Sequence, residues 1–268
     1  MRHALEWIEQ RALEDVSRAM AGRAGELGQA CRDLAGAHLS AYGALPPSAI
    51  VVNRTIGLGL HRAADAAILD ELVATYAAAG VRRYFVHLHP EAQPADLDAM
   101  LGARGLVAAR AWVKFERGRE APPDVATTLD LRLAGPADAA TLGTIAADAF
   151  DLGPQGQGIV AALIGRPNWH VFMTSHAGAV AGCGALYVED GIGWLDWGAT
   201  APAFRGRNGQ SALLRRRIEA ALDLGCRTIA TCTGEEVPGD PQISWHNIIK
   251  MGFTRAYTRR NFAPPREP

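Results

Sequence analysis

The sequence predicts a protein of the α/β (α+β) class, in which strands and helices alternate along two halves of the chain. Short apolar runs bounded by turn residues alternate with longer segments in which apolar residues recur at the helical period. Several predicted helices are followed by glycine, the residue favoured just after a helix. The order of elements in the first half also returns in the second half. Together these observations predict sheets covered by helices.

The first half begins with a helical pattern over residues 4–36, which Gly22, Gly25 and Gly28 weaken in its middle, so that it is one helix or two. The elements expected after it are a strand at 48–56, a helix at 63–79, a strand at 83–88, a helix at 94–104 and a strand at 106–115. The run from Gly118 to Asp124 is rich in proline and charge and reads as a linker. We therefore expect one domain over 1–120 and another over 128–268.

The second half contains more strands than the first. We expect a strand at 129–133, a helix at 136–150, a loop at 151–158, a short helix at 159–164, strands at 169–174, 179–188 and 193–200, a helix at 211–224, a strand at 227–233, a helix at 243–250 and a strand at 253–262.

The glycines that follow helices suggest how the two halves are related. Gly225 follows Gly80 by 145 residues, and Gly252 follows Gly105 by 147 residues. Such similar spacings favour an internal duplication over the chance recurrence of a common α/β pattern. The run from Gly57 to Arg62 stands where the second half has Arg205 to Gln210. If the first half is a copy, this run has lost the arginine and the full turn that the second half keeps.

Composition and charge exclude several classes of function. The chain has 268 residues, 49% hydrophobic and 21% charged, with a formal net charge of -1, as in an ordinary soluble globular protein. The balanced charge gives no electrostatic reason for nucleic acid or a membrane surface as partner. The cysteines lack zinc-type spacing, and we expect free thiols and no metal. The charged N-terminus does not resemble a signal peptide, and we expect a cytoplasmic protein.

The most informative stretch runs from Thr200 to Leu214. A short apolar strand leads into it, an amphipathic helix follows it, and Gly206 and Gly209 lie in the turn between them with Arg205. The first N–H groups of a helix lack partners within the helix, and the helix dipole favours an anion beside them. The stretch therefore predicts a phosphate-binding turn, in which Arg205 and Arg207 can pair with phosphate oxygens.

This stretch resembles the signature of the GNAT superfamily of acyl-CoA-dependent N-acyltransferases. In that signature Gln or Arg is followed by two residues, Gly, one residue, and then Gly or Ala. The run from Arg205 to Gln210 corresponds to it, with Asn208 and Gln210 at positions where glycine and a small residue are usual. Asparagine tolerates a left-handed backbone, so we expect the turn to form. The run from Ser244 to Phe253 is similar to the later Asn…Gly-Phe segment of the family.

The resemblance implies a tandem protein with two GNAT-like domains, of which the first is degenerate. Each is expected to be a mixed, mostly antiparallel twisted sheet flanked by helices. The strand at 195–200 is expected to splay from the strand at 227–233, leaving a wedge for the pantetheine arm of acetyl-CoA or a related acyl-CoA. The implied cofactor-binding residues are Gly198, Ala199, Thr200, Arg205, Gly206, Arg207, Asn208, Gly209, Gln210, Ser211 and Asn247. The arginines at 215–217 are interpreted as a solvated helix face, or alternatively as contacts to the ribose phosphate.

Acylation of an amine needs a proton acceptor for the amine and a proton donor for the leaving thiolate. Asp196, on the strand beside the wedge, is a candidate base or a structural carboxylate. Glu235, with Glu236, follows the next strand and is a candidate for meeting a cationic substrate. Tyr257 is a candidate proton donor or a core tyrosine.

The resulting hypothesis is direct transfer of an acetyl group from acetyl-CoA to a small-molecule amine, without a metal. A tandem transferase with a larger acyl donor or acceptor is one alternative, and a non-catalytic acyl-CoA-binding or sensor protein is another. The predicted helical face at 4–36 is either packing surface or the face of a homodimer.

Overall fold

The computed structural model describes residues 3–240 and 242–266, which form two compact units. The first unit comprises the described residues of 1–113 and 257–268, and the second comprises 114–256. This division differs from the expected domains 1–120 and 128–268 in where the last strand, β11 (Thr254–Ala263), belongs. Its C-terminal part pairs antiparallel with a strand of the first unit, from Arg260 opposite Leu88 to Phe262 opposite Val86. The final segment therefore completes the first unit.

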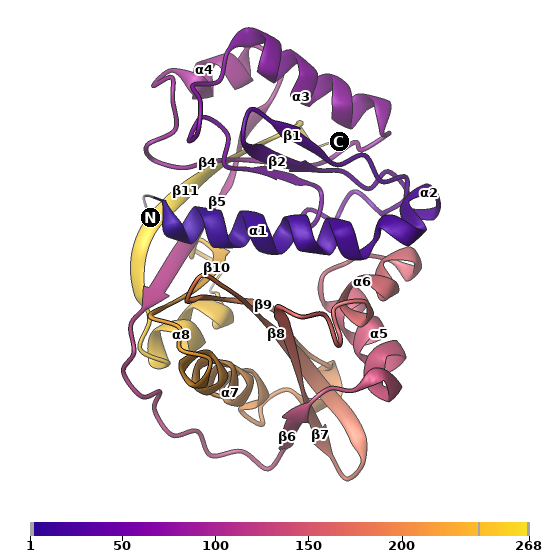
Figure 1. Ribbon diagram of the computed structural model, residues 1–268, viewed down its shortest axis with the longest axis vertical. Helices are drawn as coiled ribbons and strands as arrows, with labels where there is room; N and C mark the ends of the chain where they lie inside the picture. Colours follow the sequence, from indigo (N-terminus) through magenta and orange to yellow (C-terminus); the bar gives the residue numbers. More distant parts are fainter. Residues whose placement is uncertain (1–2, 241, 267–268) are drawn as a thin grey trace. The chain divides into compact units, whose positions relative to one another are not determined.

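The strands of the first unit follow the order β1-β2-β3-β4-β11-β5, in which β3 and β4 are parallel. Their bounds are β1 Arg32–Leu34, β2 Ala37–Ser40, β3 Arg54–Ile56, β4 Phe85–Leu88 and β5 Val107–Arg117. The helices are α1 Ala4–Ala19, α2 Ala24–Leu27, α3 Ala66–Ala78 and α4 Leu97–Gly102. Helices α3 and α4 cover one face of these strands and α1 covers the other (Figure 1). The core beneath α3 and α4 contains the buried side chains of Leu69, Leu72 and Leu101.

The helix expected at 4–36 is shorter, because α1 ends at Ala19 and a β-hairpin occupies the end of the range. Gly28 has a left-handed backbone (φ 58°) and ends α2, and Ala35 and Gly36 form the left-handed turn between β1 and β2. Leu34 and Leu39 both enter the core from this hairpin. The strand expected at 48–56 likewise forms only over Arg54–Ile56.

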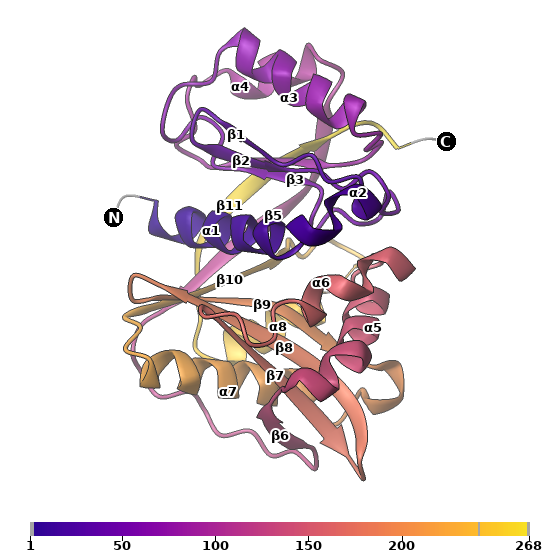
Figure 2. The ribbon, with the colours of Figure 1, turned by 45° about the vertical axis from the view of Figure 1, so that its right-hand side comes forward.

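The second unit follows the strand order β5-β10-β9-β8-β7-β6, and its elements lie close to the predicted positions. The strands are β6 Asp130–Leu133, β7 Trp169–His176, β8 Ala179–Glu189, β9 Ile192–Thr200 and β10 Thr228–Gly234. The helices are α5 Ala139–Ala149, α6 Gly158–Ala161, α7 Gly209–Asp223 and α8 Ile243–Lys250. Helices α5 and α6 lie on one side of β7–β9 and α7 on the other (Figure 2). In both units a mixed, mostly antiparallel sheet is flanked by helices, which confirms the predicted fold class.

Strands β9 and β10 are parallel neighbours that separate along their length. Their ladder runs from Thr228 opposite Ile192 to Ala230 opposite Trp194. The Thr231 hydroxyl then donates to the Leu195 carbonyl oxygen at 3.0 Å. Beyond that point β9 continues to Thr200 and β10 to Gly234. The predicted wedge is therefore present within the second unit.

Across residues 3–240 and 242–266, each helix is too short or too polar to cross a membrane.

Candidate functional site

The turn before α7 leaves the start of this helix open. Gly206 (φ 77°) and Asn208 (φ 58°) both have left-handed backbones, so asparagine does support the turn at this position. The Asn208 amide donates to the Ala126 carbonyl oxygen at 2.9 Å and does not cap the helix. With no side-chain cap among the described residues, the first N–H groups of α7 and the positive end of its dipole are available to an anion.

A cavity of about 520 Å³ lies along the start of α7. Every predicted cofactor-binding residue except Arg207 lines it, from Gly198 on β9 to Asn247 on α8. Arg205 is the charged residue of this lining, so the fixed charge at the cavity is positive. The lining residues that sequence reasoning missed are Ala149, Phe204, Ile243 and Ser244.

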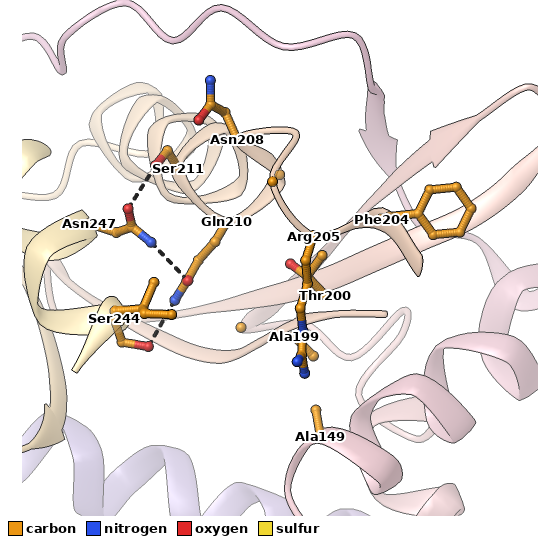
Figure 3. A pocket seen from close by; sticks show the side chains of 14 residues that line it. Ala149, Ala199, Thr200, Phe204, Arg205, Asn208, Gln210, Ser211, Ser244 and Asn247 are labelled. Carbon is orange, nitrogen blue, oxygen red and sulfur yellow. Dashed lines mark hydrogen bonds between the residues drawn. The ribbon is translucent and has the colours of Figure 1, made fainter. Parts of the chain in front are cut away.

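A chain of hydrogen bonds joins the first turn of α7 to α8 (Figure 3). The Gln210 amide donates to the Ser244 hydroxyl at 3.0 Å, and the Asn247 amide donates to the Gln210 carbonyl oxygen at 2.9 Å. The Ser211 hydroxyl donates to the Asn247 carbonyl oxygen at 3.2 Å. Gln210, at a position where the family usually has a small residue, therefore connects the start of α7 to α8 through two hydrogen bonds. Ser244 could have been identified from the sequence, because it lies three residues before Asn247 and residues three apart share one face of a helix.

The two glycines of the turn serve different purposes. A Cβ at Gly206 would meet nothing within 4 Å, so glycine is favoured there by its left-handed backbone. A Cβ at Gly209 would lie 2.9 Å from Cδ1 of Leu129, so glycine is favoured there by close packing. Arg207 does not line the cavity. Its guanidinium contacts Nε2 of His176 at 3.2 Å, and its role in ligand binding stays a prediction.

A second cavity of about 140 Å³ lies where β9 and β10 separate. Gly198, Gln210 and Ser244 line both cavities, so the two adjoin. Asp196 lines the smaller one. Its carboxylate accepts hydrogen bonds from the Trp194 indole N–H at 3.0 Å and from the Trp197 backbone N–H at 2.8 Å. The structure thus brings one of the three candidate catalytic residues to the wedge.

Arg217 corrects the interpretation of 215–217 as a solvated helix face. Its side chain is buried, lines the smaller cavity and donates to backbone carbonyl oxygens. Burial lowers the pKa of its guanidinium to about 10. Arg215 does lie at the surface, where it pairs with Glu219 at 2.8 Å. Three successive helical residues point in different directions, and the spacing of Arg217 from buried Leu213 and Leu214 places it on the inner face.

The other two candidate catalytic residues lie elsewhere. Tyr257 belongs to the first unit, where its hydroxyl donates to Oε2 of Glu6 at 2.9 Å. Burial, together with Glu6, raises the pKa of Tyr257. Glu235 follows β10 and is half-buried. Neither residue lines either cavity of the second unit, and their catalytic roles stay predictions.

Comparisons with known proteins agree with this geometry. Residues 146–253 match the model of the Acetyltransferase (GNAT) family. No curated protein matches the sequence. A GCN5-related N-acetyltransferase from Kribbella flavida is similar in structure over 100% of this chain and 98% of its own, with a TM-score of 0.65 and 14% identity. One from Sphaerobacter thermophilus is similar over 72% of this chain and 64% of its own, with a TM-score of 0.56 and 14% identity.

A tandem GNAT protein from the clavulanic acid biosynthesis pathway is similar over 80% of this chain and 76% of its own, with a TM-score of 0.54 and 16% identity. Similarity at these identities establishes the fold. The residues that line both cavities lie within the segment that matches the family model. This segment matches a GNAT acetyltransferase domain, which confirms the predicted resemblance, and the match implies acyl transfer from acyl-CoA.

Proposed function

We propose that the second unit transfers an acetyl group from acetyl-CoA directly to the amine of a small molecule. One observation carries this proposal. The larger cavity extends from the separated end of β9 to the uncapped start of α7, and its charged lining residue is Arg205. A long ligand with an anionic end fits such a cavity, because the helix N-terminus attracts the anion and the strand end offers unpaired backbone groups.

The residues present fit the diphosphate and pantetheine parts of acetyl-CoA. Backbone N–H groups from Gly206 to Ser211 would hold the diphosphate, and Arg205 would neutralise part of its charge. Backbone groups at Gly198, Ala199 and Thr200 would pair with the pantetheine amides. Asn247 would support the pantetheine arm or the substrate from α8. Acetyl-CoA itself supplies an activated acetyl thioester.

Direct transfer relies on positioning and on proton transfer. Asp196 is the candidate base that lines the smaller cavity, next to the place where the thioester end would lie. We retain Glu235 as a candidate for binding a cationic acceptor and Tyr257 as a candidate proton donor. We further propose that the reaction takes place in the cytoplasm and that the protein forms a homodimer. Sedimentation measurements test the homodimer.

The decisive experiment measures binding and turnover separately. Calorimetry with acetyl-CoA gives the affinity, and release of free thiol in the presence of a panel of amines gives the rate. We expect binding and amine-dependent thiol release. Absence of binding would overturn the proposal. Binding without turnover on any amine would favour a sensor, and faster turnover with longer acyl-CoA donors would favour a transferase with a larger donor.

A further inference from the structure

Strand β9 carries a bulge at the junction of the two cavities. Cys183 on β8 faces Ala199, and Ala185 faces Asp196, so two residues of β9 oppose the single residue Gly184. One of the two is Trp197, whose backbone is left-handed (φ 53°). A left-handed non-glycine residue costs about 1–2 kcal/mol and persists where its surroundings hold it in place. The bulge therefore needs a support.

The Arg217 guanidinium supplies that support from α7. Its Nη1 donates to the carbonyl oxygen of Asp196 at 2.9 Å and to that of Ala185 at 3.3 Å. Its Nε donates to the Leu213 carbonyl oxygen at 3.0 Å. One buried cation thus joins both strands at the bulge to the helix behind them. A rigid planar fork of donors suits this bridging better than the single ammonium of lysine.

Glycines on both strands make room for this side chain. A Cβ at Gly184 would lie 2.8 Å from Cζ of Arg217, and a Cβ at Gly198 would lie 3.4 Å from its Nη2. Gly184 belongs to neither cavity lining, whereas Gly198 lines both cavities. A substitution at Gly184 can therefore displace the guanidinium without touching a bound ligand.

We infer that Arg217 is a positioning residue that fixes the β9 bulge and thereby sets the rate of acyl transfer. This inference rests on the proposed function, because the bulge matters for rate when the thioester lies in the wedge. Arg217 lines the smaller cavity and is absent from the lining at the start of α7, where the diphosphate would bind. Its replacement should therefore lower kcat and leave the affinity for acetyl-CoA nearly unchanged.

The test compares Arg217→Lys with Arg132→Lys, a control for the same substitution elsewhere in the second unit. Arg132 pairs with Asp138 at 2.7 Å at the surface and lines neither cavity. Gly184→Ala is a second variant, which keeps the arginine but displaces its guanidinium. Calorimetry with acetyl-CoA, kcat with the best amine of the panel, and hydrogen exchange over residues 194–200 are measured for each variant.

For Arg217→Lys and Gly184→Ala we expect faster exchange over 194–200, an unchanged acetyl-CoA affinity and a kcat lowered by about 10- to 100-fold, as for a small misplacement of reacting groups. Arg132→Lys should resemble the native protein in all three measurements. Native kcat and exchange in folded Arg217→Lys would overturn the inference, as would weakened binding with native kcat. Failure of both variants to fold would also overturn it, because the role would then be stability. If the native protein does not bind acetyl-CoA, the proposed function fails, while hydrogen exchange still decides whether Arg217 holds the bulge.

Discussion

In the first unit the turn between β3 and α3 is filled by the protein's own chain, whereas in the second unit the turn between β9 and α7 opens onto a cavity. The Asp65 carboxylate caps α3 by accepting a hydrogen bond from the Ile68 N–H at 2.9 Å. That bond also lowers the pKa of Asp65, so a negative charge stays at the helix start. The backbone of Gln93 closes the turn, accepting from Ala64 and donating to Gly59, both at 2.9 Å.

The comparison shows that one local geometry can be satisfied from within or left for a ligand. Each helix follows a strand with a parallel neighbour and a turn with left-handed residues, which are Gly57 and Gly59 before α3 and Gly206 and Asn208 before α7. Each also has first N–H groups without partners within the helix and a positive dipole end. In α3 an internal carboxylate meets this requirement, whereas α7 follows Asn208, whose side chain points away to Ala126. We propose that the first unit is a duplicated copy whose phosphate site has been closed in this way.

The largest effect is expected when a negative charge is placed in the turn between β9 and α7. Gly209→Glu places a carboxylate at the start of α7, where repulsion of the diphosphate should cost several kcal/mol, or more than about 100-fold in acetyl-CoA affinity. Calorimetry measures the change. Gly209→Ala adds the same Cβ against Leu129 without the charge, and Gly22→Glu adds the charge in the first unit, where a Cβ meets nothing within 4 Å. Normal binding by the glutamate variant would show that another loop holds the ligand.

The next largest effect is expected on the stability of the first unit when the pH is lowered. In the first unit His38 is buried beside Ser17, and burial lowers its pKa from 6.5 to about 4, with weaker influences from Glu14, Arg18, Asp33 and Arg54. The unfolded chain therefore binds a proton below pH 6.5 that the folded protein does not. The contribution of His38 to stability should be full above pH 6.5 and fall by about 3 kcal/mol on the way to pH 4.

Urea unfolding at a series of pH values measures this loss of stability, and His38→Gln removes the titrating group. The described histidines of the second unit, His170, His176 and His246, are not fully buried. We therefore expect the variant to weaken the pH dependence of signals from the first unit, where burial also lowers the pKa of His87 and leaves a residual dependence. An unchanged slope between pH 6.5 and pH 4 would contradict the assignment to His38.

A smaller effect is expected when α7 is made to resemble α3. Asn208→Asp supplies a carboxylate before α7 while keeping a residue that tolerates the left-handed backbone. Acetyl-CoA affinity should fall by about tenfold, or ~1.4 kcal/mol, and the difference should shrink at high salt. Asn168→Asp makes the same change of charge elsewhere in the second unit and should bind normally. A salt-independent loss would point to the lost hydrogen bond to Ala126 instead.

The smallest effect is expected from the opposite change in the first unit. Asp65→Ala removes the cap of α3, so the free energy of unfolding should fall slightly, as for the loss of one helix cap. Acetyl-CoA affinity should stay the same, because Gln93 still fills the turn. Thermal unfolding and calorimetry measure the two quantities. A second acetyl-CoA site in this variant would show that Asp65 alone keeps the first turn closed.

The sequence was most informative where local chemistry decides the structure. The glycines at 80, 105, 225 and 252 each adopt the left-handed backbone expected after a helix, and the turn at 205–211 brings its residues to a cavity as predicted. It was less informative where distant contacts decide. Leu34 and Leu39 form a hairpin because its partner strand lies at Arg54–Ile56, and no local pattern reveals that pairing. Arg217 looks like its exposed neighbours until the carbonyl oxygens around the bulge are seen.

Strand β11 has a consequence for how the molecule is made. Arg259 forms buried ion pairs with Glu6 at 3.0 Å and with Glu9 at 2.7 Å, which joins β11 to the first helix. A chain that emerges from the ribosome N-terminus first thus lacks a central strand of its first unit until residues 114–256 of the second unit have been made. Pairing over such a sequence separation is slow, because a long loop must close first. We therefore expect the first unit, although synthesised first, to complete its folding after the second unit.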